Sequence, residues 1–137
     1  FIKRGTRDSA ISSMQKMSEA MIAGDHVVLF PEGTTTDGTK IRKFHARLFQ
    51  SAIDSKNKVQ PVLIRYPHEN GVHPKAPFID DITLYESAIG MLGEPHMRVD
   101  IYFLEPVETK DQSRKQLVQA CEDLLQNKLL QITSTKT

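Results

Sequence analysis

The sequence predicts an α/β domain in which a largely parallel sheet is flanked by helices. The first observation is a strand–helix–strand succession over residues 26–30, 44–55 and 59–64. A unit of about forty residues with this order pairs its two strands in parallel through a right-handed crossover. The second observation is that both predicted strands are mostly apolar, which is typical of a sheet covered on both faces. The third is a helical spacing of apolar residues over residues 112–130.

The remaining elements follow from periodicity and from turn residues. Residues 9–23 carry apolar side chains at helical spacing, and Gly24 can end that helix. Residues 66–77 hold three prolines and a glycine and therefore predict a loop. A short helix is expected over residues 82–91, and alternation of apolar and polar residues predicts a strand over 99–103.

A single partial domain over residues 1–132 accounts for these elements, with a disordered tail over residues 133–137. The chain begins at Phe1 without a methionine, and we interpret it as part of a longer protein that lacks its amino-terminal portion here.

Composition excludes several classes of protein. The chain has 137 residues, of which 39% are hydrophobic and 26% are charged, as expected for one globular domain. A net charge of +1 argues against a nucleic-acid binder that works by phosphate neutralisation. The single cysteine, Cys121, excludes an internal disulfide and a zinc cluster, and its helical context predicts a small apolar side chain rather than a catalytic thiol. No metal site is predicted, and no apolar run approaches the roughly 18 residues that span a bilayer.

One loop, residues 30–38, carries most of the functional information. It follows an apolar run and places Glu32 between a proline and a glycine, before three threonines. Gly33 would let a ligand approach the backbone closely, and the hydroxyls of Thr34 and Thr35 offer donors without charge. A polar, anionic ligand fits such a loop at a strand end. Glu32 is equally compatible with a turn-capping carboxylate.

Basic residues flank this loop on both sides. Three precede the first predicted helix and five follow the loop: Lys3, Arg4, Arg7, Lys40, Arg42, Lys43, His45 and Arg47. A solvated surface is one interpretation. If the two groups converge on the loop, their arginines suit a phosphate, because a guanidinium donates two parallel hydrogen bonds.

Three short blocks resemble the PlsC-like glycerolipid acyltransferases. Phe-Ile-Lys-Arg at residues 1–4, Phe-Pro-Glu-Gly-Thr at 30–34 and Val-Gln-Pro-Val at 59–62 occur in the order and approximate spacing of three of that family's four blocks. Over roughly residues 1–110, the chain resembles the carboxyl-terminal two thirds of a 1-acylglycerol-3-phosphate acyltransferase domain. The resemblance implies the glycerol-3-phosphate acyltransferase-like α/β fold.

The resemblance also implies an activity in phospholipid biosynthesis. A fatty acyl group would move from acyl-CoA or acyl carrier protein, as co-substrate and without a further cofactor, to the hydroxyl of a lysolipid. By position, Arg4 matches the second block near the head group, Glu32 and Gly33 match the third block in acceptor binding, and Pro61 matches the fourth block linked to the acyl donor. The parent protein is expected at the cytoplasmic face of a membrane, which it would meet through segments outside these residues.

Two departures from the family pattern matter. The family's catalytic base is the histidine of an H-x4-D motif, and no histidine here has an aspartate five positions on, so this chain alone is expected to be inactive. Thr35 stands where the family commonly has arginine, and the missing charge-assisted bond weakens recognition of a phosphomonoester by about 1.5–3 kcal/mol. Lysophosphatidic acid is the first expectation for the acceptor. The alternatives are a lyso-ornithine lipid or another lysolipid, and a non-catalytic module that binds lipid head groups.

Overall fold

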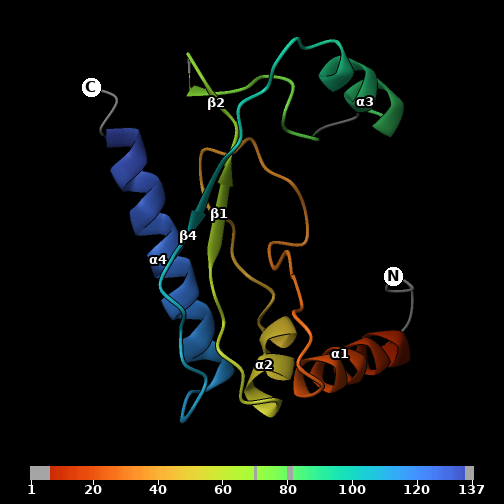
Figure 1. Cartoon of the computed structure of the whole chain (residues 1–137), viewed down its shortest axis with the longest axis vertical. Helices are drawn as coiled ribbons and strands as arrows, with labels where there is room; N and C mark the ends of the chain where they lie inside the picture. The colour runs from red at the N-terminus through yellow and green to blue at the C-terminus, as the bar shows by residue number, and fades with distance from the viewer. Residues whose placement is uncertain (1–6, 70, 80–81, 135–137) are drawn as a thin grey trace.

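The computed structural model describes residues 7–69, 71–79 and 82–134, with side chains from residue 12 onward. Within these ranges the chain forms both helices and strands, so the predicted mixture of α and β structure is confirmed (Figure 1). The elements, in order, are α1 (Arg7–Ile22), η1 (Ala46–Phe49), α2 (Gln50–Asp54), β1 (Val62–Arg65), β2 (Pro67–His68), β3 (Gly71–Val72), α3 (Leu84–Leu92), β4 (Asp100–Phe103) and α4 (Arg114–Ser134).

Both sheets of the described chain are antiparallel pairs, so the prediction of a largely parallel sheet is wrong for these residues. β1 pairs with β4, with Val62 opposite Phe103 and Arg65 opposite Asp100, and β2 pairs with β3 in a short hairpin. Residues 26–30 form no strand, and Val28 and Phe30 remain 79% and 74% exposed. The predicted strand over residues 26–30 is therefore wrong, because an apolar pattern does not specify which strand lies alongside.

The predicted helices are confirmed in place, with shifted ends. The helix expected over residues 44–55 begins at Ala46 and consists of the 3-10 helix η1 followed directly by α2. Phe44 lies before it and donates its N–H to Glu122 Oε1 of α4 at 2.6 Å. α4 continues through Ser134, into the segment predicted as a tail, and Thr133 donates its hydroxyl to the Leu129 carbonyl at 3.0 Å. Residues 135–137 lie outside the described residues.

The hydrophobic core lies between α4, the inner face of β1 and the η1–α2 segment. Leu117 and Cys121 of α4 are 0% and 1% exposed, which confirms the apolar environment predicted for the cysteine. Burial raises the pKa of the Cys121 thiol to about 11, so this side chain is inert at neutral pH. Phe44 and Phe49 stack with ring centroids 6.0 Å apart and close the core beneath α4.

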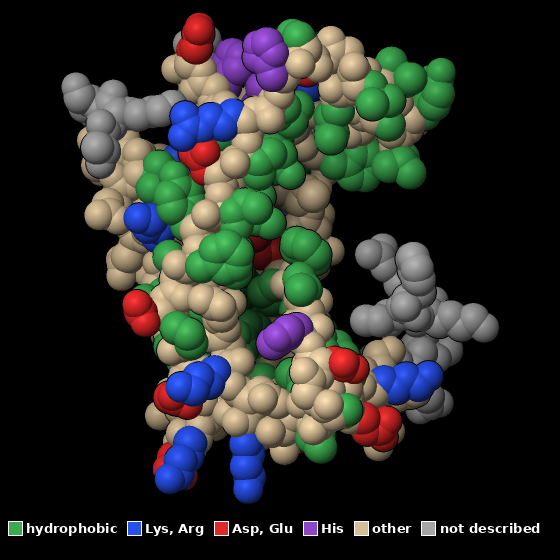
Figure 2. All heavy atoms as spheres, viewed as in Figure 1, with side chains coloured by type: hydrophobic (Ala, Val, Ile, Leu, Met, Phe, Trp, Pro, Cys, Tyr) green, Lys and Arg blue, Asp and Glu red, His purple; other side chains and the backbone are tan. Residues whose placement is uncertain are grey.

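The β1–β4 pair is covered on one face only in the described chain. Leu63 and Arg65 point toward α4 and are buried, whereas their neighbours Val62 and Ile64 are 38% and 43% exposed. On β4, Phe103 is 69% exposed. Figure 2 shows hydrophobic side chains gathered along this face and again on α3. The expectation of a sheet covered on both faces is therefore wrong for this part of the chain.

Among the described residues, no helix combines the length and the apolar character that a bilayer crossing requires.

Candidate substrate-binding loop

The loop that the sequence singled out is a tight turn followed by a returning segment. The N–H of Gly33 donates to the carbonyl of Phe30 at 3.1 Å, with Pro31 at the second turn position, where its fixed φ is favourable. Gly33 has a φ of +72°, a left-handed conformation that glycine adopts without steric cost. The proline and the glycine thus have the turn-forming roles that their order predicts.

Two hydrogen bonds fasten the turn to the segment that precedes η1. Glu32 Oε2 accepts the backbone N–H of Arg42 at 2.9 Å, and the carbonyl of Pro31 accepts the N–H of His45 at 2.9 Å. The carboxylate therefore has the structural role that was one of its two interpretations. Its second oxygen, Oε1, has no hydrogen bond among the described residues, and the side chain is half-buried, so a ligand can still reach it.

His45 lies directly over Gly33. A Cβ atom added at Gly33 would be 2.7 Å from His45 Nε2 and 2.9 Å from Cδ2, so any larger residue there would displace the ring. His45 belongs to the basic segment 40–47, and the structure brings that segment to the loop through this ring and through the Arg42 backbone. The cationic side chains Lys40, Arg42 and Arg47 are exposed to solvent.

The threonines hold the loop in place rather than presenting a row of free donors. Thr35 donates its hydroxyl to the carbonyl of Phe78, which ties the loop to the segment after β3. Thr34 makes only a long contact, 3.5 Å, with the carbonyl of its neighbour. Further along, Asp37 accepts both the hydroxyl and the N–H of Thr39, and these bonds hold the pKa of Asp37 below its usual range.

The other predicted site residues are not brought to this loop by any described contact. Pro61 is buried, and its carbonyl accepts the N–H of Leu104 at 3.0 Å, so it continues the pairing of the β1–β4 region. Arg7 begins α1, but its side chain is outside the description, and Arg4 lies outside the described residues altogether. Their roles in head-group binding stay predictions.

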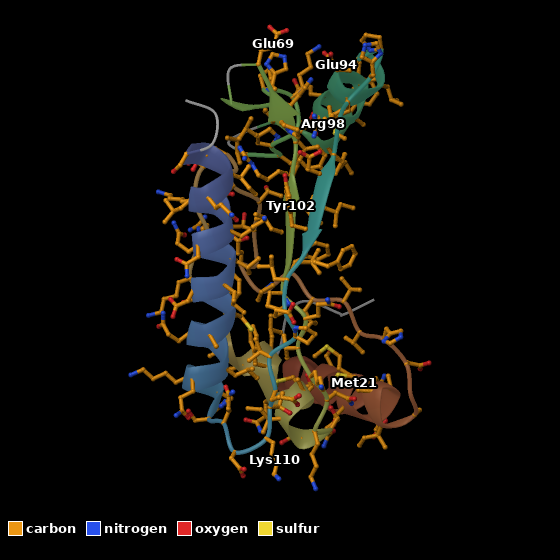
Figure 3. The ribbon with its side chains drawn as sticks, turned by 60° about the vertical axis from the view of Figure 1, so that its left-hand side comes forward. Met21, Glu69, Glu94, Arg98, Tyr102 and Lys110 are labelled. Carbon is orange, nitrogen blue, oxygen red and sulfur yellow. The ribbon has the colours of Figure 1, made fainter. Side chains whose placement is uncertain are left out.

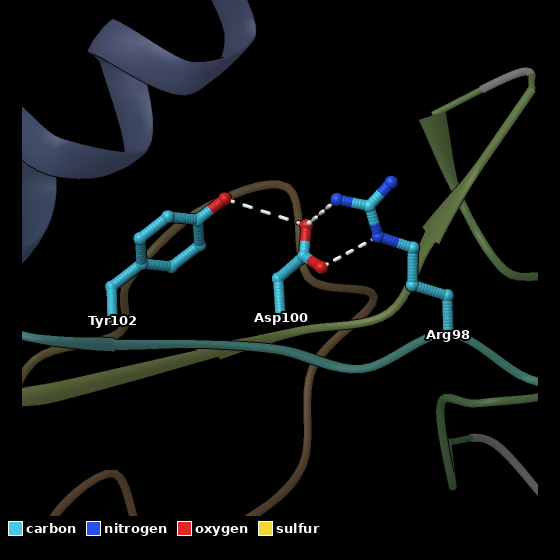
Figure 4. A network of polar contacts seen from close by, with 3 residues as sticks. All are labelled: Arg98, Asp100 and Tyr102. Carbon is cyan, nitrogen blue, oxygen red and sulfur yellow. Dashed lines mark hydrogen bonds and ion pairs between the residues drawn. The ribbon is translucent and has the colours of Figure 1, made fainter.

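A second polar cluster, which the sequence did not predict, lies at the opposite end of the molecule from Lys110 (Figure 3). His73 is buried, its Nε2 is 3.8 Å from Glu94 Oε2, and Lys75 Nζ is 2.6 Å from Glu94 Oε1. Asp100 accepts two hydrogen bonds from the Arg98 guanidinium, at 2.7 and 3.2 Å, and one from the Tyr102 hydroxyl at 3.4 Å (Figure 4). His73 and Lys75 are about twenty residues from Glu94 in the sequence, and Arg98, Asp100 and Tyr102 alternate with other residues. Neither spacing corresponds to a recognisable sequence motif.

No group of three or more histidine, cysteine, aspartate or glutamate side chains in the described ranges is placed to hold a metal ion.

Comparison with known proteins identifies the family. The Acyltransferase family model matches residues 1–65, which include the loop and Pro61. The chain is 38% identical over 117 residues to lyso-ornithine lipid O-acyltransferase of Pseudomonas aeruginosa, an alignment that covers 85% of this chain and 45% of that protein. It is 32% identical to the protein of the same name in Brucella abortus, over 95% of this chain and 55% of that protein. The chain belongs to the acyltransferase family.

A third relative has a different acceptor in its name. This chain is 37% identical over 84 residues to 1-acyl-sn-glycerol-3-phosphate acyltransferase of Neisseria gonorrhoeae, covering 61% of this chain and 33% of that protein. The chain thus spans about half the length of the curated relatives it matches, or less. No solved structure matches it.

Proposed function

We propose that this acyltransferase chain is part of an enzyme that moves a fatty acyl group from a thioester to the hydroxyl of a lysolipid. The hydroxyl oxygen attacks the thioester carbonyl, the C–S bond breaks, and the hydroxyl proton ends on the departing thiol. The observation that carries the proposal is the Glu32 loop, whose turn is closed by two hydrogen bonds while one carboxylate oxygen stays reachable. A preformed polar turn of this kind orients an acceptor without having to be ordered at each turnover.

The catalytic base of this proposal lies in the part of the family domain that these residues do not span. None of the five histidines has the H-x4-D spacing, and the chain covers only about half of the relatives that it matches. Glu32 and Gly33 then bind the acceptor beside that base. The largely parallel sheet implied by the family resemblance would add strands to an outer edge of the β1–β4 pair.

For the acceptor we favour a lyso-ornithine lipid over lysophosphatidic acid, which reverses the order that the sequence alone suggested. Thr35 brings no positive charge to the loop, and its hydroxyl is already engaged with the Phe78 carbonyl. A phosphomonoester therefore lacks a charged partner at that position, whereas an ornithine head group carries its own ammonium beside its carboxylate. Lysophosphatidic acid remains the second candidate because of the relative from Neisseria.

The donor in this proposal is acyl-CoA or acyl carrier protein, and the enzyme works at the cytoplasmic face of a membrane. Both statements rest on the family resemblance.

The test is acyl transfer by the full-length protein, measured with labelled acyl-CoA and a panel of lysolipids. Glu32→Gln keeps an amide oxygen that can accept the Arg42 N–H, so the loop should stay closed while the charge is lost. We expect a fall in kcat/KM of about tenfold or more with an unchanged melting temperature. Turnover equal to that of the unchanged protein would remove Glu32 from the acceptor site.

The acceptor preference is tested with Thr35→Arg in the same assay. The new guanidinium should raise the rate with lysophosphatidic acid relative to lyso-ornithine lipid by about tenfold, the worth of one charge-assisted bond. Thr34→Arg, one position earlier, is the matched control. An identical acceptor ratio before and after the Thr35 substitution would contradict the head-group argument.

A further inference from the structure

A groove lies between the carboxyl-terminal half of α4 and the end of the β1–β4 pair that carries Arg65. Its volume is about 980 Å³, and the β2–β3 hairpin and the segment around Glu94 form its far wall. It is distinct from the Glu32 loop, since none of the residues that line it belongs to that loop. Figure 3 shows Tyr102 between the sheet and α4, with Arg98 and Glu94 farther along the same side.

Arg65 is the unusual residue of this groove. Its side chain points toward α4, it is only 7% exposed, and its Nε atom is buried without a hydrogen-bond partner among the described residues. A guanidinium stays charged in proteins, and burying a charge is unfavourable unless an acceptor offsets the loss of water. The described chain therefore leaves the buried Nε–H of Arg65 without an acceptor.

The acidic groups that line the groove do not supply that acceptor. Asp100, directly opposite Arg65 on β4, is held by Arg98 and by the hydroxyl of Tyr102. Glu94 is held by Lys75, whose ammonium lowers the pKa of that carboxyl, and it also faces His73. Glu69 is exposed, and Figure 3 places it at the outer end of the molecule. Each acid is thus either paired elsewhere or turned to solvent.

A second cation lies on the α4 wall of the groove. Lys128 Nζ is 5.0 Å from the centre of the Tyr102 ring and 3.2 Å from Gln131 Oε1, and no carboxylate of the described chain pairs with it. Arg65 and Lys128 therefore leave the groove with two cations that have no carboxylate partner among the described residues.

We propose that this groove binds a phosphate group, with Arg65 as its main hydrogen-bond donor and Lys128 as a second cation. A guanidinium and an ammonium together match the charge and the several acceptor oxygens of a phosphate. The groove has room for a larger molecule that carries the phosphate. Two sources share this chemistry: a soluble phosphate ester such as the nucleotide part of a thioester donor, and a phospholipid head group. Binding by itself does not depend on the proposed acyl transfer.

The first experiment is calorimetric titration of the full-length protein with inorganic phosphate, followed by the two sources. Coenzyme A is compared with its 3′-dephospho form, and vesicles of phosphatidylcholine with 20 mol% phosphatidic acid are compared with phosphatidylcholine alone. We expect saturable phosphate binding and, in one of these pairs, a preference of about tenfold for the member that carries the phosphomonoester. Preference for coenzyme A identifies a nucleotide source, and preference for the acidic vesicles identifies a lipid source. The absence of saturable phosphate binding would overturn the proposal, because Arg65 would then have its acceptor elsewhere in the protein.

Variants locate the site. Arg65→Met keeps the length of the side chain without its charge and should weaken phosphate binding about tenfold or more, while Lys128→Met should weaken it severalfold. Lys110→Met is the matched control, since Lys110 is exposed at the opposite end of the molecule and its loss should change nothing (Figure 3). If Arg65→Met does not fold, the phosphate affinity of Lys128→Met is the test of the site. Unchanged phosphate affinity in a folded Arg65→Met protein, or equal losses in Lys128→Met and Lys110→Met, would refute the site.

Discussion

The helices α3 and α4 begin in the same way and end up in opposite environments. In α3 the Thr83 hydroxyl accepts the Glu86 N–H, and the Glu86 carboxylate accepts the Thr83 N–H. In α4 Ser113 and Gln116 exchange the same pair of bonds. Yet five residues of α4 are buried, and none of the residues of α3 is. A capping box therefore sets where a helix begins, but it does not determine whether the helix is packed.

Composition does not explain the difference either. α3 is mostly apolar, and its Leu84, Tyr85 and Leu92 are 77%, 75% and 82% exposed. α4 carries many polar residues, but its apolar side chains recur on one face and meet β1 and η1. α4 is therefore held by tertiary packing, whereas α3 depends mainly on its own cap and backbone. An exposed apolar helix and the open face of β1–β4 are surfaces of the kind that contact other parts of a protein or a partner.

The largest expected effect contrasts one leucine from each helix. Leu117→Ala removes a side chain that is 0% exposed and should lower the free energy of unfolding by about 2–5 kcal/mol. Leu92→Ala, at 82% exposure, should change it by no more than about 0.5 kcal/mol. Urea unfolding of the two variants measures both. Similar losses in the two variants would show that α3 is covered in solution.

A smaller effect is expected from removing the two caps. Thr83→Ala and Ser113→Ala should each cost about 1 kcal/mol, because each leaves an amide of the first turn without its acceptor. The two substitutions should differ in how much of the helix loses protection from hydrogen exchange. Hydrogen exchange should show the whole of α3 losing protection in Thr83→Ala, and only the first turn of α4 in Ser113→Ala. Loss confined to the first turn in both helices would mean that α3 has packing contacts that hold it.

The smallest effect is a difference in acid sensitivity between the two caps. The backbone N–H of Thr83, and then its hydroxyl, hold the pKa of Glu86 below its usual range. A carboxyl whose folded pKa is depressed stabilises the fold above its unfolded pKa, and this contribution is lost as the pH falls through the folded value. Backbone chemical shifts of α3 should therefore move toward unfolded values on acidification, while those of the first turn of α4 should not, since Gln116 does not titrate.

Glu86→Gln is the control for this titration, because it converts the cap of α3 into that of α4. A titration of the α3 shifts that persists in this variant would assign the acid sensitivity to another group.

Local signals were sufficient for much of this chain. The periodicity of α1 and α4, the buried cysteine and the Pro-Glu-Gly turn were predictable, because each depends on neighbours within a few residues. The parallel pairing of residues 26–30 was not, since an apolar run is compatible with several neighbours. The ring of His45 over Gly33 and the buried Arg65 also had no sequence signal, as their partners lie on segments brought together only by folding.

The family, the turn that carries Glu32 and the helix that builds the core can all be predicted from the amino-acid sequence, because periodicity, turn chemistry and motif are properties of adjacent residues. Three features emerge only in the folded chain: Glu32 accepts the Arg42 N–H, α3 stays exposed, and Arg65 is buried without a carboxylate partner among the described residues. These outcomes depend on which distant segments share a surface, and the energies of burial and hydrogen bonding that settle this choice are made between elements rather than within them.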